Sequence, residues 1–349
     1  MRKDGTVPHE PTGIEISRDY YRDVVGPLLT STFPGLPHSA GRFGSGSDVL
    51  GLDDATSRDH DWGLRLSLFV PAETVEAVDA RLERALPESF NGLATRFAFT
   101  GQAERRHHVD VGTLQDFLYD RLGFDPRAGM TAPDWLSLTG QAVLEVTAGP
   151  VFADVTGEVA TVRRLLQWYP DDVWRLVVAC DWSRLEQELP LMSRAAAAGD
   201  DLGSRVILGR LVNIAMHLAF LLERSWPPYA KWFGTLFERL ACADDVGDPL
   251  TAAVLATDWR RRQDELSRAL QNLLAMQNDL GLTDVREATI PFWDRPFVHP
   301  DPRIVEQLLE GIADPSIRAL PVGLGGVEQR TDNVALLMDP AARRALVGA

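Results

Sequence analysis

The chain has 349 residues, 45% of them hydrophobic, which is enough to bury a sizeable core and to form more than one domain. Its 35 Lys and Arg against 50 Asp and Glu give a net charge of −15, which argues against nucleic-acid binding and favours a cationic or neutral substrate. Only Cys180 and Cys242 are present, without ligand spacing, so neither a disulfide framework nor a zinc site is indicated. We expect a cytoplasmic location. The longest apolar run, residues 211–222, is too short for a membrane span, so no membrane partner is expected.

Up to about residue 155, short β-rich runs alternate with helical patterns, which predicts an α+β domain with a mixed sheet. Helical patterns cover residues 17–29 and 72–86. Strands are expected over residues 42–49, 64–70, 97–100 and 108–113. The first of these strands should lead into a turn rich in glycine and serine.

Beyond residue 155, long helical periodicity predicts an antiparallel helical bundle. One helix is expected over residues 171–189, with acids at its positive end, and another from Leu202 to the Pro227-Pro228 pair, which cannot supply backbone donors. Further helices are expected over residues 229–240 and 249–280. The expected domains are residues 1–155, residues 156–290, and a C-terminal tail, 291–349, that packs back on the other two.

A glycine–serine turn precedes two carboxylates in the first domain. Such a turn offers backbone N–H groups and hydroxyls to phosphate oxygens, and its glycines allow an approach that a Cβ would block. In a strand beginning at Asp59, alternation places Asp59 and Asp61 on one face, where both could bind Mg²⁺ that bridges nucleotide phosphates. This order predicts nucleotidyl transfer, although each element alone is also typical of a solvated turn. The turn consists of Gly44, Ser45, Gly46 and Ser47.

A third carboxylate is expected to join this pair from a neighbouring strand. Asp110, between Val109 and Val111, is the first candidate, because alternation isolates one acid within an apolar run. An exposed edge-strand residue would give the same pattern. Glu145 is the competing candidate, either for the metal or as a general base that deprotonates the acceptor hydroxyl.

Several blocks of the sequence resemble, in order, a bacterial family known as a domain of unknown function within the polymerase-β-like nucleotidyltransferases. The blocks are GSGSD at 44–48, SRDHDWG at 57–63, YPDDVW at 169–174, PYAKW at 228–232 and GGVEQ at 325–329. The resemblance covers most of the chain. It implies a nucleotidyltransferase-type mixed-sheet domain followed by a helical domain similar to that of kanamycin nucleotidyltransferase.

The resemblance also implies roles for particular residues. Ser45 and Ser47 match phosphate-binding serines, and Asp59 and Asp61 match metal-binding carboxylates. His60 departs from the pattern, since the residue between the carboxylates is usually apolar in that superfamily. The implied cofactors are Mg²⁺ and ATP, or another nucleoside triphosphate, as donor. The acceptor hydroxyl is unidentified; an aminoglycoside-like compound suits the acidic chain.

Three residues of the helical domain are candidates for contacts to the triphosphate. Arg224, Tyr229 and Lys231 surround the Pro227-Pro228 break, where a redirected chain could aim cations at phosphate. The alternative is a helix corner at which cations snorkel past core aromatics.

Two other functions fit parts of the sequence. Arg210 and His217 show an Arg-x₆-His spacing that resembles the catalytic pair of helical ribonuclease domains, although a core histidine in an apolar run gives the same pattern. A non-catalytic nucleotide-binding or scaffold protein would retain the aspartates without acting on an acceptor.

Overall fold

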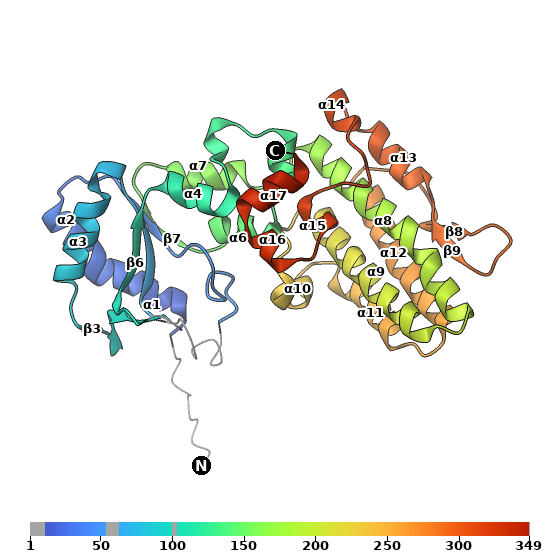
Figure 1. The fold of residues 1–349 in the computed structure, drawn as a ribbon, viewed down its shortest axis with the longest axis horizontal. Coiled ribbons are helices and arrows are strands. Elements are labelled where there is room, and N and C mark those ends of the chain that lie inside the picture. Colours follow the sequence, from blue (N-terminus) through green and yellow to red (C-terminus); the bar gives the residue numbers. More distant parts are fainter. Residues whose placement is uncertain (1–10, 54–62, 100–102, 349) are drawn as a thin grey trace, which may run out of the picture. The chain divides into compact units, whose positions relative to one another are not determined.

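The computed structural model describes residues 11–53, 63–99 and 103–348, which fold into two compact units. Unit 1 comprises Met1–Gly129 with Ala142–Gln167, and unit 2 comprises Met130–Gln141 with Trp168–Ala349 (Figure 1). The chain therefore passes from unit 1 to unit 2, returns, and passes again. The structure is a mixed α+β protein with a small mixed sheet and many helices, as the sequence predicts.

The sheet of unit 1 has the strand order β5-β6-β2-β1-β7. Strand β1 pairs antiparallel with both β2 and β7, β2 pairs parallel with β6, and β5 pairs antiparallel with β6. The strands are β1 (Ser39–Gly41), β2 (Arg65–Phe69), β5 (Arg96–Phe97), β6 (Arg106–Gly112) and β7 (Val151–Asp154). A separate hairpin joins β3 (Ser89–Phe90) to β4 (Leu93–Ala94).

One face of this sheet is buried by N-terminal helices. Leu66 and Leu68 of β2 and Val109 of β6 belong to one core cluster with residues of α1 (Gly13–Tyr20) and α3 (Val75–Ala85). Because side chains alternate along a strand, the residues between them, such as Ser67, belong to the opposite face. The helix predicted over 17–29 lies inside a continuous helical segment, α1, a π-helical turn (Tyr21–Val25) and α2 (Gly26–Thr32).

The predicted helix over 72–86 is confirmed by a 3₁₀ turn (Ala72–Thr74) and α3, and the strands over 64–70 and 108–113 by β2 and β6. The strand predicted over 42–49 is wrong, because β1 ends at Gly41 and the chain then turns. The strand over 97–100 is also displaced, since β5 covers only Arg96–Phe97 and residue 100 lies outside the described part of the chain.

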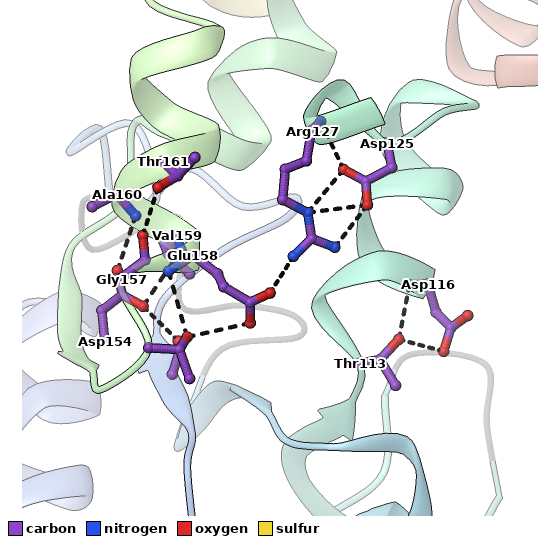
Figure 2. Close-up of polar contacts among 12 residues, drawn as sticks. Thr113, Asp116, Asp125, Arg127, Asp154, Gly157, Glu158, Val159, Ala160 and Thr161 are labelled. Carbon is purple, nitrogen blue, oxygen red and sulfur yellow. Dashed lines mark hydrogen bonds and ion pairs between the residues drawn. The ribbon is translucent and has the colours of Figure 1, made fainter. Parts of the chain in front are cut away.

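The remaining helices of unit 1 include α7 (Glu158–Leu165) and a 3₁₀ turn (Pro126–Ala128) that polar contacts join. The others are α4 (Leu114–Leu122) and the part of α6 (Gly140–Thr147) from residue 142. Asp154, at the end of β7, accepts hydrogen bonds from the backbone N–H groups of Val159 and Ala160 at the start of α7 (Figure 2). Arg127 pairs with Asp125 and, at 2.5 Å, with Glu158. Strand β7 and α7 are therefore held to the 3₁₀ turn.

Long helices that pack side by side form most of unit 2. Helix α9 packs against α8, α11 and α12, and Trp182 of α8 donates a hydrogen bond to Gln277 of α12. The helices are α5 (Ala132–Ser137), α8 (Asp171–Ala197), α9 (Asp201–Leu222), α10 (Ala230–Phe237), α11 (Ala243–Leu255) and α12 (Trp259–Asp279). The helices predicted from Leu202 and over 229–240 correspond to α9 and α10.

Two helix predictions are wrong at their ends. Helix α8 continues through the buried Pro190 to Ala197, beyond the expected end at residue 189. The single helix predicted over 249–280 is two helices, because the chain becomes extended at Ala256 and Asp258. The Asp258 side chain accepts a hydrogen bond from the Arg260 N–H, so it starts α12 as an N-cap.

Apart from β8 (Thr289–Pro291) and β9 (Val298–Pro300), the C-terminal part of unit 2 consists of short helices. Helix α13 packs against α8, and α17 packs against α5, where Arg344 pairs with Asp134 at 2.5 Å. The helices are α13 (Arg303–Glu310), α14 (Pro315–Arg318), α15 (Val327–Arg330), α16 (Val334–Met338) and α17 (Pro340–Val347).

Helix α9 is the one helix in the described residues with the length and composition to cross a membrane, and 50% of its apolar window is buried. The apolar run over 211–222 was expected to be too short for a span, but the helix that contains it has 22 residues. Its packing against α8, α11 and α12 is that of a core helix.

Candidate functional site

The glycine–serine turn follows β1 and folds around a buried ion pair. The Arg42 guanidinium donates hydrogen bonds to both carboxylate oxygens of Asp48, at 2.6 and 3.0 Å, and to the backbone carbonyls of Phe43 and Ser45, at 2.6 and 2.9 Å. Both charged side chains are almost fully buried. The ion pair therefore fixes the path of the backbone from residue 42 to residue 48.

Gly46 is required by this arrangement. Its φ is +144°, and a Cβ there would lie 2.2 Å from Oδ1 of Asp48 and 2.6 Å from Nη2 of Arg42. Ser45 is exposed and Ser47 is half-buried. Neither hydroxyl forms a hydrogen bond to any residue in the described part of the chain. The turn thus presents two serines on a backbone whose shape is fixed from within.

The sheet register locates this turn. Gly41 of β1 lies opposite Ser67 of β2, and Ser67 lies opposite Asp110 of β6. Because β1 is antiparallel to β2, and β2 is parallel to β6, the chain leaves β1 at the end of the sheet where both other strands begin. The turn and the start of β2 therefore share one end of the sheet.

Asp110 is an exposed residue on the face of the sheet opposite the helical core. Phe69, two residues after Ser67 on the same strand, shares this face and packs its ring 5.3 Å from that of Phe43, next to the turn. Within the described residues, the Asp110 carboxylate accepts no hydrogen bond and forms no ion pair. Within the described part of the chain, Asp110 could therefore bind a cation without breaking an existing hydrogen bond or ion pair.

Glu145 occupies a different environment from Asp110. It lies on α6, is 3% exposed, and pairs with Nη1 of Arg121 at 3.2 Å. Its backbone carbonyl accepts a hydrogen bond from Gly44 N–H at 2.8 Å. Glu145 therefore connects the turn and Arg121 to α6.

Arg121 was not singled out by the sequence reasoning. Its Nη2 lies 3.5 Å from the position of a Cβ at Gly44, and its guanidinium lies over the ring of Phe117, 5.6 Å from the centroid. A cation is therefore placed directly beside the turn. No local pattern indicates this role, since other helices of the chain also have an arginine in the last turn.

The predicted metal ligands Asp59 and Asp61, with His60, lie outside the described residues. In residues 11–53, 63–99 and 103–348, no three His, Cys, Asp or Glu side chains come close enough to hold a metal ion. A site with three such ligands that includes Asp110 would accordingly need at least one residue outside the described part of the chain.

The three phosphate-contact candidates of unit 2 have partners of their own. Arg224 lies over the ring of Trp174, 4.3 Å from its centroid, and 3.8 Å from Asp171. Lys231 lies over the neighbouring ring of Trp232. The Tyr229 N–H donates to the side chain of Gln141, while the Tyr229 side chain is exposed. These contacts are those of a helix corner, and a role in phosphate binding stays a prediction.

A buried polar cluster lies elsewhere in unit 2. Asp181, which is fully buried on α8, is 2.5 Å from Nδ1 of His217 on α9 and 2.9 Å from Arg184. It also accepts a hydrogen bond from Gln329 of α15 at 2.8 Å. Burial alone would raise the pKa of Asp181, but the contacts with His217 and Arg184 lower it by more, so the pKa lies below its ordinary value. Burial lowers the pKa of His217, but Asp181 raises it above its ordinary value.

Glu328 extends this cluster. Its carboxylate accepts a hydrogen bond from the Gly140 N–H at 3.0 Å, and burial raises its pKa to about 7 despite the opposing charge of His217. Burial, with the charges of Glu328 and Asp181, also raises the pKa of Tyr169. The GGVEQ block therefore fastens the C-terminal segment to α8 and to the start of α6.

The structure does not join Arg210 to His217. Arg210 is half-exposed and pairs with Glu188 at 2.7 Å, whereas His217 is bound to Asp181. The two residues share a helix but have different partners, so the proposed ribonuclease pair is not assembled.

The described fold and site define a two-unit α+β protein with a glycine–serine turn at the end of a mixed sheet. The profile of a family described as a domain of unknown function (DUF4037) matches residues 135–233. That range contains two of the blocks that carried the resemblance, YPDDVW and PYAKW. A search of curated proteins found no match.

Among solved structures, the chain is similar to the crystal structure of a nucleotidyltransferase-like protein from Exiguobacterium sibiricum. The two are 12% identical over 76% of each chain, with a TM-score of 0.33. At these values the likeness defines neither the site nor the activity of this chain.

Proposed function

We propose that this protein is a Mg²⁺-dependent nucleotidyltransferase. It transfers a nucleoside monophosphate, AMP from ATP, to a hydroxyl of a small molecule such as an aminoglycoside-like compound, and releases pyrophosphate. The observation that carries the proposal is the turn of residues 44–47, which is fixed by a buried ion pair at the end of the sheet. It closely follows Gly41, which lies in one row with Ser67 and Asp110 across the sheet. The likeness of unit 2 to kanamycin nucleotidyltransferase is an implication of the sequence resemblance alone.

The turn supplies the triphosphate contacts in this proposal. Backbone N–H groups of the turn and the hydroxyls of Ser45 and Ser47 donate to phosphate oxygens, and the absence of a Cβ at Gly46 keeps the backbone close. Arg121, beside Gly44, offsets phosphate charge.

Three carboxylates supply the metal ligands in this proposal. Asp59 and Asp61 precede β2 in the sequence by six and four residues, and Asp110 is in the strand beside β2. Oxygen ligands of this type suit Mg²⁺. When bound, Mg²⁺ neutralises phosphate charge and orients the attacking and leaving oxygens.

The environment of the two remaining acids favours Asp110 as the third ligand over Glu145. Asp110 is exposed and has no ion pair in the described part of the chain, whereas Glu145 is paired with Arg121. Glu145 therefore acts as a positioning residue that orients Arg121 beside the turn, and we do not assign it as the general base.

Thermal stabilisation by nucleotides tests the proposal. A ligand that binds the folded state raises its stability by mass action, so one nucleoside triphosphate should raise the Tm in the presence of Mg²⁺. Asp59→Asn, Asp61→Asn and Asp110→Asn should each remove most of this shift and reduce pyrophosphate release at least ~100-fold. Their Tm without metal should stay within about 2 °C of the wild type.

Asp120→Asn is the matched control, because Asp120 is an exposed aspartate of unit 1 on α4 and its substitution makes the same change of charge. This variant should keep both the metal-dependent shift and the activity. If no triphosphate stabilises the wild type, or if Asp120→Asn loses as much of the Tm shift and of the activity as Asp110→Asn, the proposed site is wrong. Nucleotide binding without product formation would instead favour a non-catalytic protein.

A further inference from the structure

A cavity in unit 2 lies among α9, α10 and α11, and none of the candidate residues for nucleotidyl transfer lines it. Its volume is about 620 Å³, within the range of small-molecule sites. Helix α9 packs against both α10 and α11, so three helices fix its walls. The cavity is therefore a formed feature of the bundle.

The walls of the cavity have more apolar than polar surface. Phe237 and Leu250 are almost fully buried and form its deeper part, whereas Val254 and Leu255 are 46% and 74% exposed. Val212 and Met216 of α9 complete this surface. An apolar surface that remains partly in contact with water is stabilised by an apolar ligand.

The charged groups of the cavity are all acidic. Glu238, Asp244 and Asp248 line it and are exposed, and no Lys, Arg or His does so. Within the described residues none of the three carboxylates forms an ion pair. Asp244 and Asp248 are four residues apart on α11, a spacing at which like charges destabilise a helix. A cation in the cavity would relieve this repulsion.

We propose that this cavity binds an organic cation with an apolar body, such as an amphiphilic amine. The apolar part of the ligand would lie against Phe237 and Leu250, and its ammonium group would lie beside Asp244 and Asp248. This chemistry differs from that of an aminoglycoside, which has no apolar body. The site is independent of nucleotidyl transfer in unit 1.

Glycine positions provide a direct way to block the cavity. Gly234 of α10 lines it, and a Cβ at Gly234 would meet no atom within 4 Å. Gly234→Leu therefore fills the cavity from one wall and improves the helix propensity of α10. Gly209 of α9 is also an open helical glycine but does not line the cavity, so Gly209→Leu is the matched control.

Dansylcadaverine is a suitable probe, because it joins a primary amine to a fluorescent aromatic group that brightens in apolar surroundings. We expect saturable binding to the wild type, about 10-fold weaker binding to Gly234→Leu, and binding within about 2-fold of wild type for Gly209→Leu. The Asp244→Asn, Asp248→Asn protein should bind the probe ~5- to 10-fold more weakly. N-acetylated dansylcadaverine, which is neutral, should bind the wild type as weakly as the amine binds the Asp244→Asn, Asp248→Asn protein.

Circular dichroism melting establishes that each variant is folded, and if Gly234→Leu is not, the paired Asn substitutions and the acetylated probe decide the question. The proposal is overturned if the wild type shows no saturable binding, if folded Gly234→Leu binds like the wild type, or if the acetylated probe binds as tightly as the amine. The nucleotide-dependent Tm shift is measured separately, so a failure here leaves the proposed transfer activity untouched.

Discussion

Asp110 in unit 1 and Asp181 in unit 2 are aspartates in opposite environments. Asp110 is exposed on β6 and, in the described part of the chain, forms no ion pair. Asp181 is fully buried on α8 and interacts with His217, Arg184 and Gln329. A buried carboxylate with several partners is needed for the stability of the fold, whereas an exposed carboxylate on a strand can bind a ligand. The two aspartates therefore allow a role in stability to be tested separately from the proposed role in metal binding.

The largest effect on stability is expected for Asp181→Asn. The substitution removes the charge that offsets His217 and Arg184, and leaves cationic groups without a buried partner. We expect the free energy of unfolding to fall by about 3 kcal/mol, measured by urea denaturation. Asp110→Asn should change it by less than about 0.5 kcal/mol. Equal losses for the two variants would contradict the comparison.

A smaller loss is expected for Gly46→Ala, which tests whether the turn of unit 1 is fixed from within. The added Cβ would meet Asp48 and Arg42 and adopt an unfavourable φ, so we expect a loss of about 2 kcal/mol in the free energy of unfolding and a loss of the nucleotide-dependent Tm shift.

Gly51→Ala is the control for this substitution, because Gly51 has a φ of +64° but no atom within 4 Å of an added Cβ. Gly51→Ala should lower the free energy of unfolding by only about 1 kcal/mol, from backbone strain alone, and should keep the nucleotide-dependent Tm shift. A Gly46→Ala protein that behaves like Gly51→Ala would show that the buried ion pair does not constrain the turn.

The smallest effect is a pH dependence from the cluster of unit 2. The pKa of Glu328 rises from 4.5 to about 7 on folding, so between these values the folded chain holds a proton that the unfolded chain releases. The free energy of unfolding should therefore fall, by about 1 to 2 kcal/mol for this half-buried group, as the pH rises from 4.5 to 7. His217, whose pKa is raised above 6.5, adds a further loss as the pH rises through its folded value.

Glu328→Gln separates these contributions, because it removes the dependence between pH 4.5 and 7 and leaves the loss due to His217 at higher pH. Urea denaturation at a series of pH values measures both. A wild type whose stability rises over pH 4.5 to 7, with the Glu328→Gln protein showing the same slope, would contradict the assignment.

Local patterns predicted the strands and helices whose stability depends on burial of one face. In β2, Leu66 and Leu68 alternate with Ser67 in the sequence, and in the structure the two leucines belong to the core cluster while Ser67 does not. The strand predicted over 42–49 was wrong because the Arg42 guanidinium binds the Asp48 carboxylate and the Ser45 carbonyl and so bends the chain into a turn. Hydrophobic periodicity gives no information about such side-chain contacts. The single helix over 249–280 was wrong because one N-cap hydrogen bond, from Arg260 to Asp258, starts a new helix.

The candidate site was predictable only in part, for a similar reason. The turn and Asp110 each have a local signature, and the sheet places Gly41, just before the turn, in one row with Asp110. Arg121 has none, because its place beside Gly44 depends on tertiary packing. The partners Asp181 and Gln329 are 148 positions apart, so no spacing in the sequence could indicate their contact.

The repeated passage of the chain between the two units has a consequence for how the protein can be divided. Unit 1 needs the segment Ala142–Gln167, which provides β7 and α7, and unit 2 needs Met130–Gln141, which provides α5. No single cleavage of the backbone leaves both units whole, because a cut after Gln167 removes Met130–Gln141 from unit 2 and a cut after Gly129 removes Ala142–Gln167 from unit 1. A protease that nicks one loop, or a recombination event with one crossover, would therefore leave at least one unit incomplete.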